Sequence, residues 1–161
     1  MTDQSHTRFS VALNVNGVKR KTEVRSADIL LDVLRNNFGL TGAKPGCLNG
    51  DCGSCTVLVN GWPIKSCMML AVAASNTNIV TVEGLKGSAT QRAFIEKNAF
   101  QCGYCTPGFI MNIEGLSAIH PDADDSIIEE WLQSNICRCT SYEEIKAAVY
   151  KVLGKKPEAG R

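Results

Sequence analysis

The chain has 161 residues, enough for one domain of ordinary size or two small ones. Hydrophobic residues make up 44% of it and charged residues 20%, and 17 Lys and Arg nearly balance 16 Asp and Glu. This composition excludes a strongly basic nucleic-acid-binding surface and an acidic disordered chain, so we expect a near-neutral globular protein with no nucleic-acid partner.

The N-terminal segment predicts the cellular compartment. Residues 1–8 are polar and lack the apolar run of a secretory signal, and no segment is long and apolar enough for a membrane span. We therefore expect a cytoplasmic protein. Disulfides explain eight cysteines poorly in that compartment, because thiols are kept reduced there. Metal ligation is the leading explanation for them.

The first patterned segment predicts a β-hairpin. Residues 9–15 alternate apolar and polar side chains, and residues 18–24 can return antiparallel to them. Asn16-Gly17 between them favours a two-residue turn, because both residues tolerate positive φ angles.

A short helix and two further strands follow. Apolar residues recur at helical spacing over residues 29–38, and Ser26 is expected to cap this helix. After a glycine-rich stretch, residues 56–59 and 79–82 have the pattern of strands, with Asn60-Gly61 as a second hairpin turn. The first half is therefore predicted to be a mixed sheet with one helix.

Beyond residue 83 the pattern changes to helices. Pro107 suits the first turn of a helix, and Thr140 and Ser141 each stand three residues before a glutamate, which is the capping-box spacing. The apolar periodicity predicts four helices, over residues 88–98, 106–119, 126–133 and 140–153. The second half is therefore predicted to be a four-helix domain.

Four cysteines in the first half have the pattern of cluster ligands. Cys47, Cys52 and Cys55 reproduce the C-x4-C-x2-C spacing of plant-type ferredoxins. Three thiolates that wrap one face of a small inorganic core force tight backbone curvature, which the interleaved glycines allow. Cys67, just beyond the second hairpin, is the candidate fourth ligand. These four residues are predicted to hold one [2Fe–2S] cluster.

Four cysteines in the second half are predicted to hold another. Cys102 and Cys105 lie far in sequence from Cys137 and Cys139, yet each pair directly precedes a predicted helix. Helix N-termini favour anions, and a [2Fe–2S] core with four thiolates carries a charge of about −2 when oxidised and about −3 when reduced. The helical domain is therefore expected to be built around a second [2Fe–2S] cluster.

Other uses of these residues fit less well. Two structural Zn(Cys)4 sites would use the same residue type, but zinc sites usually pair C-x2–4-C knuckles. A disulfide framework suits a secreted chain. A Rieske centre needs two histidines beside cysteine pairs, and neither His6 nor His120 is so placed. Trp62 and Trp131 are expected to pack in the core rather than to contact a cofactor.

Three segments are distinctive, namely GCLNGDCGSCTV (46–57), QCGYCTPG (101–108) and NICRCT (135–140). Together they resemble a known family, the iron–sulfur component of molybdenum hydroxylases, which include xanthine dehydrogenases, aldehyde oxidoreductases and aerobic carbon monoxide dehydrogenases. The resemblance covers nearly the whole chain. It implies an α+β fold, with an N-terminal β-grasp domain of the plant-type ferredoxin kind over residues 1–82 and a C-terminal four-helix domain over residues 83–161.

The resemblance also implies cofactors and partners. The cluster of the helical domain would lie beside a molybdopterin-type molybdenum cofactor in a large subunit, and the other cluster would face FAD in a medium subunit. Gln101 and the Cys139 region would lie near the pterin, although Gln101 could equally satisfy backbone groups of its own loop. No catalytic residue is expected in this chain. The enzyme would be a dimer of heterotrimers.

Two positions depart from the family pattern. Ser54 stands where Ala is usual, and Ser141 stands where Gly is usual after Cys-Arg-Cys-Thr. The Ser54 hydroxyl is expected to hydrogen-bond near the sulfurs and to raise the cluster potential, since such bonds stabilise the more negative reduced state. Two other functions stay open: a free ferredoxin-like carrier, and a zinc-stabilised interaction module, which would be colourless.

Overall fold

The computed structural model describes residues 7–155, and it contains a five-stranded sheet followed by a group of helices. The predicted α+β fold is confirmed. Residues 1–6 and 156–161, the outer ends of the two predicted domains, lie outside the described residues. Over the described range, no helix is both long and apolar enough to cross a membrane.

The sheet is mixed, with the strand order β2-β1-β5-β3-β4. The strands are β1 (Arg8–Val15), β2 (Val18–Arg25), β3 (Thr56–Val59), β4 (Trp62–Lys65) and β5 (Asn78–Val80). β1 and β5 run parallel, and the other neighbouring pairs are antiparallel. Both Asn-Gly turns have the positive φ angles that such hairpins need, so the two predicted hairpin turns are confirmed. β5 ends before Val82, where the prediction had extended it.

The helix that packs on the sheet differs from the prediction at its start. It consists of α1 (Leu30–Asp32) and a π-helical continuation, η1 (Val33–Asn37). Its N-cap is Ile29, without a side-chain cap, so the predicted cap at Ser26 is wrong. Ile29 instead forms a β-bridge with Leu70, which keeps the backbone extended up to the helix start. A tertiary contact thus overrides the local capping signal.

The four predicted helices of the second half are confirmed, with ends shifted by a few residues. They are α2 (Ala89–Glu96), α3 (Thr106–Ile119), α4 (Asp125–Leu132) and α5 (Tyr142–Val152). α5 is capped by Ser141, whose Oγ accepts a hydrogen bond from the Glu143 N–H at 3.2 Å. Of the two predicted caps Ser141 is therefore confirmed and Thr140 is wrong, because the helix begins one residue later.

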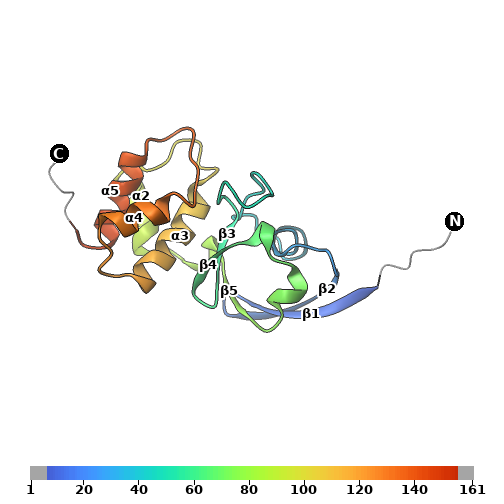
Figure 1. Ribbon diagram of the computed structural model, residues 1–161. Helices are drawn as coiled ribbons and strands as arrows, with labels where there is room; N and C mark the ends of the chain where they lie inside the picture. Colours follow the sequence, from blue (N-terminus) through green and yellow to red (C-terminus); the bar gives the residue numbers. More distant parts are fainter. Residues whose placement is uncertain (1–6, 156–161) are drawn as a thin grey trace.

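Two groups of buried side chains form separate cores, one under the sheet and one among the helices. In Figure 1 the sheet and the helices α2 to α5 lie side by side. The first includes Leu13, Val15, Leu30, Leu34, Val57 and Ile79, and the second includes Phe94, Phe109, Ile113, Leu116, Ile128 and Ile145. Trp131 packs against the second core. Trp62 is 57% exposed, so its predicted core position is wrong. It lies on β4, an edge strand of the sheet.

The segment that joins the two cores is anchored to the sheet. Asn16 and Thr81 exchange two hydrogen bonds, of 2.9 and 3.0 Å. The Glu83 carboxylate accepts hydrogen bonds from the Thr81 hydroxyl at 2.5 Å and from the Gly42 N–H at 2.7 Å. Burial acts to raise the pKa of Glu83, but these two donors outweigh it and lower the pKa. The helices therefore start from a fixed point beside the first cysteine loop.

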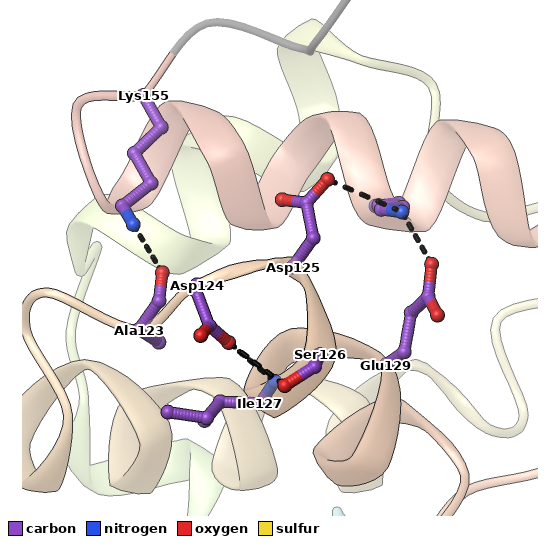
Figure 2. A network of polar contacts seen from close by, with 8 residues as sticks. Ala123, Asp124, Asp125, Ser126, Ile127, Glu129 and Lys155 are labelled. Atoms are coloured by element: carbon purple, nitrogen blue, oxygen red, sulfur yellow. Dashed lines mark hydrogen bonds and ion pairs between the residues drawn. The ribbon is translucent and has the colours of Figure 1, made fainter. Parts of the chain in front are cut away.

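Polar contacts also join α4 to α5 (Figure 2). The Asp124 carboxylate caps α4 by accepting a hydrogen bond from the Ile127 N–H at 2.9 Å. On α5, the Lys146 ammonium lies 2.7 Å from Glu129 and 4.0 Å from Asp125. These contacts fix the two helices that precede and follow the second cysteine-bearing loop.

Candidate functional site

Three of the predicted ligands of the first half lie in the loop before β3. Leu48, Gly50 and Gly53 have positive φ angles of 61°, 90° and 68°, so the backbone reverses repeatedly between the cysteines. Gly46 shows how closely this backbone approaches the sulfurs, because a Cβ there would lie 2.5 Å from Cys52 Sγ. The loop is therefore a cradle in which the glycines keep space for the sulfur atoms.

The fourth predicted ligand reaches this loop through the β3–β4 hairpin. Cys67 lies in a single 3₁₀ turn, η2 (Ser66–Met68), directly after β4. The Ser66 hydroxyl donates a hydrogen bond to the Cys55 carbonyl at 2.7 Å. Cys55 and Cys67 are both buried, and their side chains interact. The structure thus brings Cys67 beside Cys55, at the buried end of the loop.

The sulfurs of the first group differ in exposure and in proton affinity. Cys47 is exposed, and N–H groups of Cys52 and Asn49 lower its pKa to about 6. The Cys52 nitrogen lies 3.3 Å from Cys47 Sγ. At the closed end, burial raises the pKa of Cys55 to about 11. A thiolate at that buried position needs a nearby positive charge, which a bound metal supplies.

In the second half, the structure brings two distant cysteine pairs together. Cys102 Sγ and Cys139 Sγ lie 3.6 Å apart, and the side chains of Cys105 and Cys137 also interact. Metal–thiolate bonds of about 2.3 Å at tetrahedral angles separate two sulfurs by about 3.8 Å. The spacing of Cys102 and Cys139 therefore fits two ligands of one metal ion.

The second group also has an open end and a partly closed end. Cys102 and Cys139 are exposed, whereas Cys105 and Cys137 are half-buried. Burial raises the pKa of Cys105 to about 12. Burial acts in the same direction on Cys137, but N–H groups of Thr140 and Cys139 outweigh it and lower the pKa of Cys137. As in the first loop, backbone donors are directed at a sulfur.

The pairing of sulfurs favours a two-metal core over single zinc ions. A structural Zn(Cys)4 site would bring four sulfurs around one ion. Among residues 7–155, no three Cys, His, Asp or Glu side chains converge closely enough to hold one ion. In a [2Fe–2S] core each iron takes only two of the four thiolates, which matches paired cysteines. The buried Thr140 hydroxyl, which has no partner within the described range, is a further free donor beside the second group.

The two other residues singled out from the sequence lie in different surroundings. Gln101 is exposed beside Cys102, and its amide does not satisfy backbone groups of residues 7–155. Ser54 is 4% exposed, and within the same range its hydroxyl makes no hydrogen bond to a cysteine sulfur. The effect of the Ser54 hydroxyl on the cluster potential stays a prediction. Ser54 lies against the first turn of α3, at Gly108.

Hydrogen bonds directly link the loop before β3, which carries Cys47, Cys52 and Cys55, to the loop between α4 and α5, which carries Cys137 and Cys139. The Ile136 N–H donates to the Cys52 carbonyl at 3.0 Å, and Ile136 immediately precedes Cys137. The Asn135 side-chain amide donates to the Gly53 carbonyl at 3.0 Å, and Asn135 is 1% exposed. A short route of covalent bonds and one hydrogen bond thus runs between cysteines of the two groups.

A second link lies on another side of the same junction. The Tyr104 hydroxyl donates to the Pro45 carbonyl at 3.3 Å. Tyr104 stands between Cys102 and Cys105, and Pro45 stands two residues before Cys47. The sequence analysis missed these contacts, because the motifs show which residues flank the cysteines but not which loops meet.

Two family models match successive parts of the chain. A 2Fe-2S iron-sulfur cluster binding domain matches residues 13–77, and a [2Fe-2S] binding domain matches residues 81–150. The chain is 44% identical over 146 residues to the nicotinate dehydrogenase small FeS subunit of Eubacterium barkeri, covering 88% of this chain and 93% of that one.

Solved structures show the same fold. A chain of quinoline 2-oxidoreductase from Pseudomonas putida 86 matches with a TM-score of 0.86 and 38% identity, covering 91% of this chain and 94% of that chain. The aldehyde oxidoreductase of Desulfovibrio desulfuricans matches with a TM-score of 0.85 and 36% identity, covering 92% of this chain but 18% of that longer chain. The protein therefore belongs to the iron–sulfur subunits of the molybdenum hydroxylase family and is the electron-transfer component of an oxidoreductase.

Proposed function

We propose that this chain relays electrons through two [2Fe–2S] clusters, between a molybdopterin-type molybdenum cofactor in a large subunit and FAD in a medium subunit. The observation that carries the proposal is the pair of four-cysteine groups whose loops are hydrogen-bonded to each other through Ile136 and Cys52. The clusters, when bound, supply one-electron sites; the substrate chemistry and the choice of substrate belong to the large subunit.

Each cluster takes its ligands from one half of the chain. We propose that residues 1–82 bind the first cluster through Cys47, Cys52, Cys55 and Cys67. Residues 83–161 bind the second through Cys102, Cys105, Cys137 and Cys139. The buried Cys55 and Cys67 of the first group and the half-buried Cys105 and Cys137 of the second would keep water from one side of the metal. Backbone N–H groups directed at Cys47 and Cys137 would stabilise negative charge on those sulfurs.

The exposed ends of the two groups suit different partners. At the second group, Cys102, Cys139 and Gln101 are exposed, with Phe100 and Tyr104 exposed beside them. We assign this end to the large subunit, with Gln101 near the pterin. Aromatic side chains are enriched at protein interfaces, which supports the assignment.

The exposed end of the first group is assigned to the flavin subunit. Cys47 is exposed there, and so are Leu48 and Met68, with 54% and 63% of their surface accessible. Met68 packs beside Gly50 in the cysteine loop, so the apolar side chains adjoin the cluster. Clustered exposed apolar side chains are typical of protein contact surfaces. We further propose a cytoplasmic enzyme that is a dimer of such heterotrimers.

Metal analysis and purification test this function. The anaerobically purified protein is expected to contain about four iron and four acid-labile sulfide per chain, with two distinct paramagnetic resonance signals after dithionite reduction. It is also expected to copurify with two larger chains. Purification as a single iron-containing chain would instead favour a free carrier, and a colourless zinc protein would overturn the proposal.

A further inference from the structure

The hydroxyl of Tyr142 forms hydrogen bonds with the backbone on both sides of Ile136, the residue that joins the two cysteine-bearing loops. The Tyr142 hydroxyl accepts a hydrogen bond from the Cys137 N–H at 3.3 Å and donates one to the Asn135 carbonyl at 3.0 Å. These groups lie on either side of Ile136. The hydroxyl therefore holds both flanks of the peptide whose N–H reaches Cys52.

Side-chain packing does not hold Ile136 in place. Its side chain is 53% exposed, so few apolar contacts fix the residue. The direction of its N–H depends instead on the hydrogen bonds around it. On one side, Asn135 is held by hydrogen bonds of its side chain with the Ser134 hydroxyl and the Gly53 carbonyl.

The position of Tyr142 is itself well defined. It is the first residue of α5, directly after the Ser141 cap. Its ring meets the ring of Phe109 edge-on, with centroids 6.2 Å apart and an interplanar angle of 73°. Phe109 is fully buried in the core of the helical half. The hydroxyl is therefore presented to the loop from a rigid base.

We propose that Tyr142 is a positioning residue for electron transfer between the two clusters. Its hydroxyl keeps the Ile136 N–H on the Cys52 carbonyl and so maintains the hydrogen-bonded route from Cys137 to Cys52. Electron tunnelling decays more steeply across a van der Waals gap than along such a route. With both clusters bound, one electron would pass from one to the other, and no bond would form or break. The inference rests on the proposed two-cluster function.

Tyr142→Phe in the complete holoenzyme tests this role, because it keeps the ring on Phe109 and removes only the hydroxyl. The amides of Ile136 and Cys137 are expected to exchange with deuterium about thirtyfold faster, since the variant loses both hydrogen bonds of the hydroxyl and each contributes roughly a fivefold factor. Electron equilibration between the clusters after flash reduction is expected to slow by about fivefold or more. Iron content and both midpoint potentials are expected to stay close to those of the unmodified enzyme.

The matched control is Tyr150→Phe, in the same helix. The Tyr150 hydroxyl interacts with Asp125 and Lys146. It lies eight residues further along α5, about 12 Å at 1.5 Å per residue, away from the cysteine loop. This variant is expected to leave amide exchange at Ile136 and the intercluster rate unchanged.

The outcomes separate the inference from the function on which it rests. Two cluster signals in the unmodified enzyme, with an unchanged intercluster rate in Tyr142→Phe, would overturn the role of Tyr142 and leave the function standing. Missing clusters in the unmodified enzyme would overturn the function. If Tyr142→Phe does not assemble, deuterium exchange of the Cys137 amide in the unmodified holoenzyme decides, because among the described residues the Tyr142 hydroxyl is the acceptor for that N–H. Slowed exchange of this amide supports the inference, and exchange at the rate of a free amide overturns it.

Discussion

Gly108, in the first turn of α3, packs directly against the backbone of Gly53 in the first cysteine loop. A Cβ at Gly108 would overlap the Gly53 carbonyl oxygen and would lie 2.9 Å from the Cα atom of Ser54. Because both obstacles are backbone atoms, no rotamer change relieves the overlap. The two halves of the protein thus meet backbone against backbone at the cysteine loops.

Gly108→Ala is therefore expected to destabilise the protein. Helix propensity alone would favour Ala by about 1 kcal/mol, whereas overpacking of this kind costs about 1–3 kcal/mol. Thermal unfolding should show a lower Tm, and the magnetic interaction between the reduced clusters should change because the loops move apart. Ser117→Ala, in the same helix, is the control. A raised Tm in Gly108→Ala would contradict the close approach.

Cys67→Ser tests the ligand assignment that depends most on the fold, since Cys67 lies outside the C-x4-C-x2-C motif. Because a hydroxyl is a poor ligand for iron in these clusters, the variant is expected to lose the first cluster, and iron should fall from about four to about two per chain. Electron paramagnetic resonance should still show the signal of the second cluster. Retention of both signals would show that another residue completes the first site.

Ser54→Ala is expected to leave the midpoint potential of the first cluster unchanged. Over the described residues the Ser54 hydroxyl does not hydrogen-bond a sulfur, so its removal takes away no bond that stabilises the reduced state. A redox titration followed by paramagnetic resonance measures the potential. A fall in potential would mean that the hydroxyl turns toward the sulfurs when the cluster is bound.

Substitutions of Ser141 test the cap of α5. Ser141→Ala removes the acceptor of the Glu143 N–H and is expected to cost about 1 kcal/mol, whereas Ser141→Gly should cost only a few tenths, as is usual at N-caps. Denaturant unfolding followed by helical circular dichroism gives both values. No loss of stability in Ser141→Ala would show that the Ser141 hydroxyl does not cap the helix.

The ion pair of Lys146 gives a prediction for alkaline pH. The hydrogen bond with Glu129 raises the pKa of Lys146 above its ordinary value of 10.5, so the charged form stabilises the folded state. This stabilisation is fully present below pH 10.5 and is lost as the pH rises through the raised pKa. Lys146→Met should cost less than about 1 kcal/mol at pH 8, because Glu129 is mostly exposed and solvent screens the pair.

Urea unfolding of the unmodified protein and the variant at pH 8 and pH 11 measures this effect. The difference between the two proteins should be smaller at pH 11, and added salt should reduce it at pH 8. Lys21→Met, an exposed lysine on β2, is the control. A difference that grows with pH would contradict the sign of the pKa shift.

Local signals in the sequence predicted much of the fold, and long-range contacts account for the errors. Asn16-Gly17 and Asn60-Gly61 form the turns that their φ preferences require. Ser26, by contrast, does not cap a helix, because the β-bridge of Ile29 with Leu70 decides where that helix begins. Such a bridge joins residues far apart in the chain, and no spacing rule reveals it.

In the candidate sites, too, the sequence revealed local patterns but not long-range contacts. Spacing identified the eight cysteines as candidate ligands. Ligands of a small core must lie close together in the sequence, or next to a hairpin or helix that brings them back to the same place. The residues that join the sites were not found. Tyr142 and Gly108 act on backbone atoms of other loops, and neither residue type is distinctive in the sequence. Ser54 was given a role because it departs from a pattern, yet its neighbours leave its hydroxyl no sulfur partner.

The link between Ile136 and Cys52 uses main-chain atoms only. Every amino acid except proline carries the N–H that this link requires. The exposed side chain at position 136 is therefore free to change without altering the connection behind it. Under the proposed function, the outer surface of such a chain could vary among enzymes while the main-chain link between the two cysteine groups stays the same.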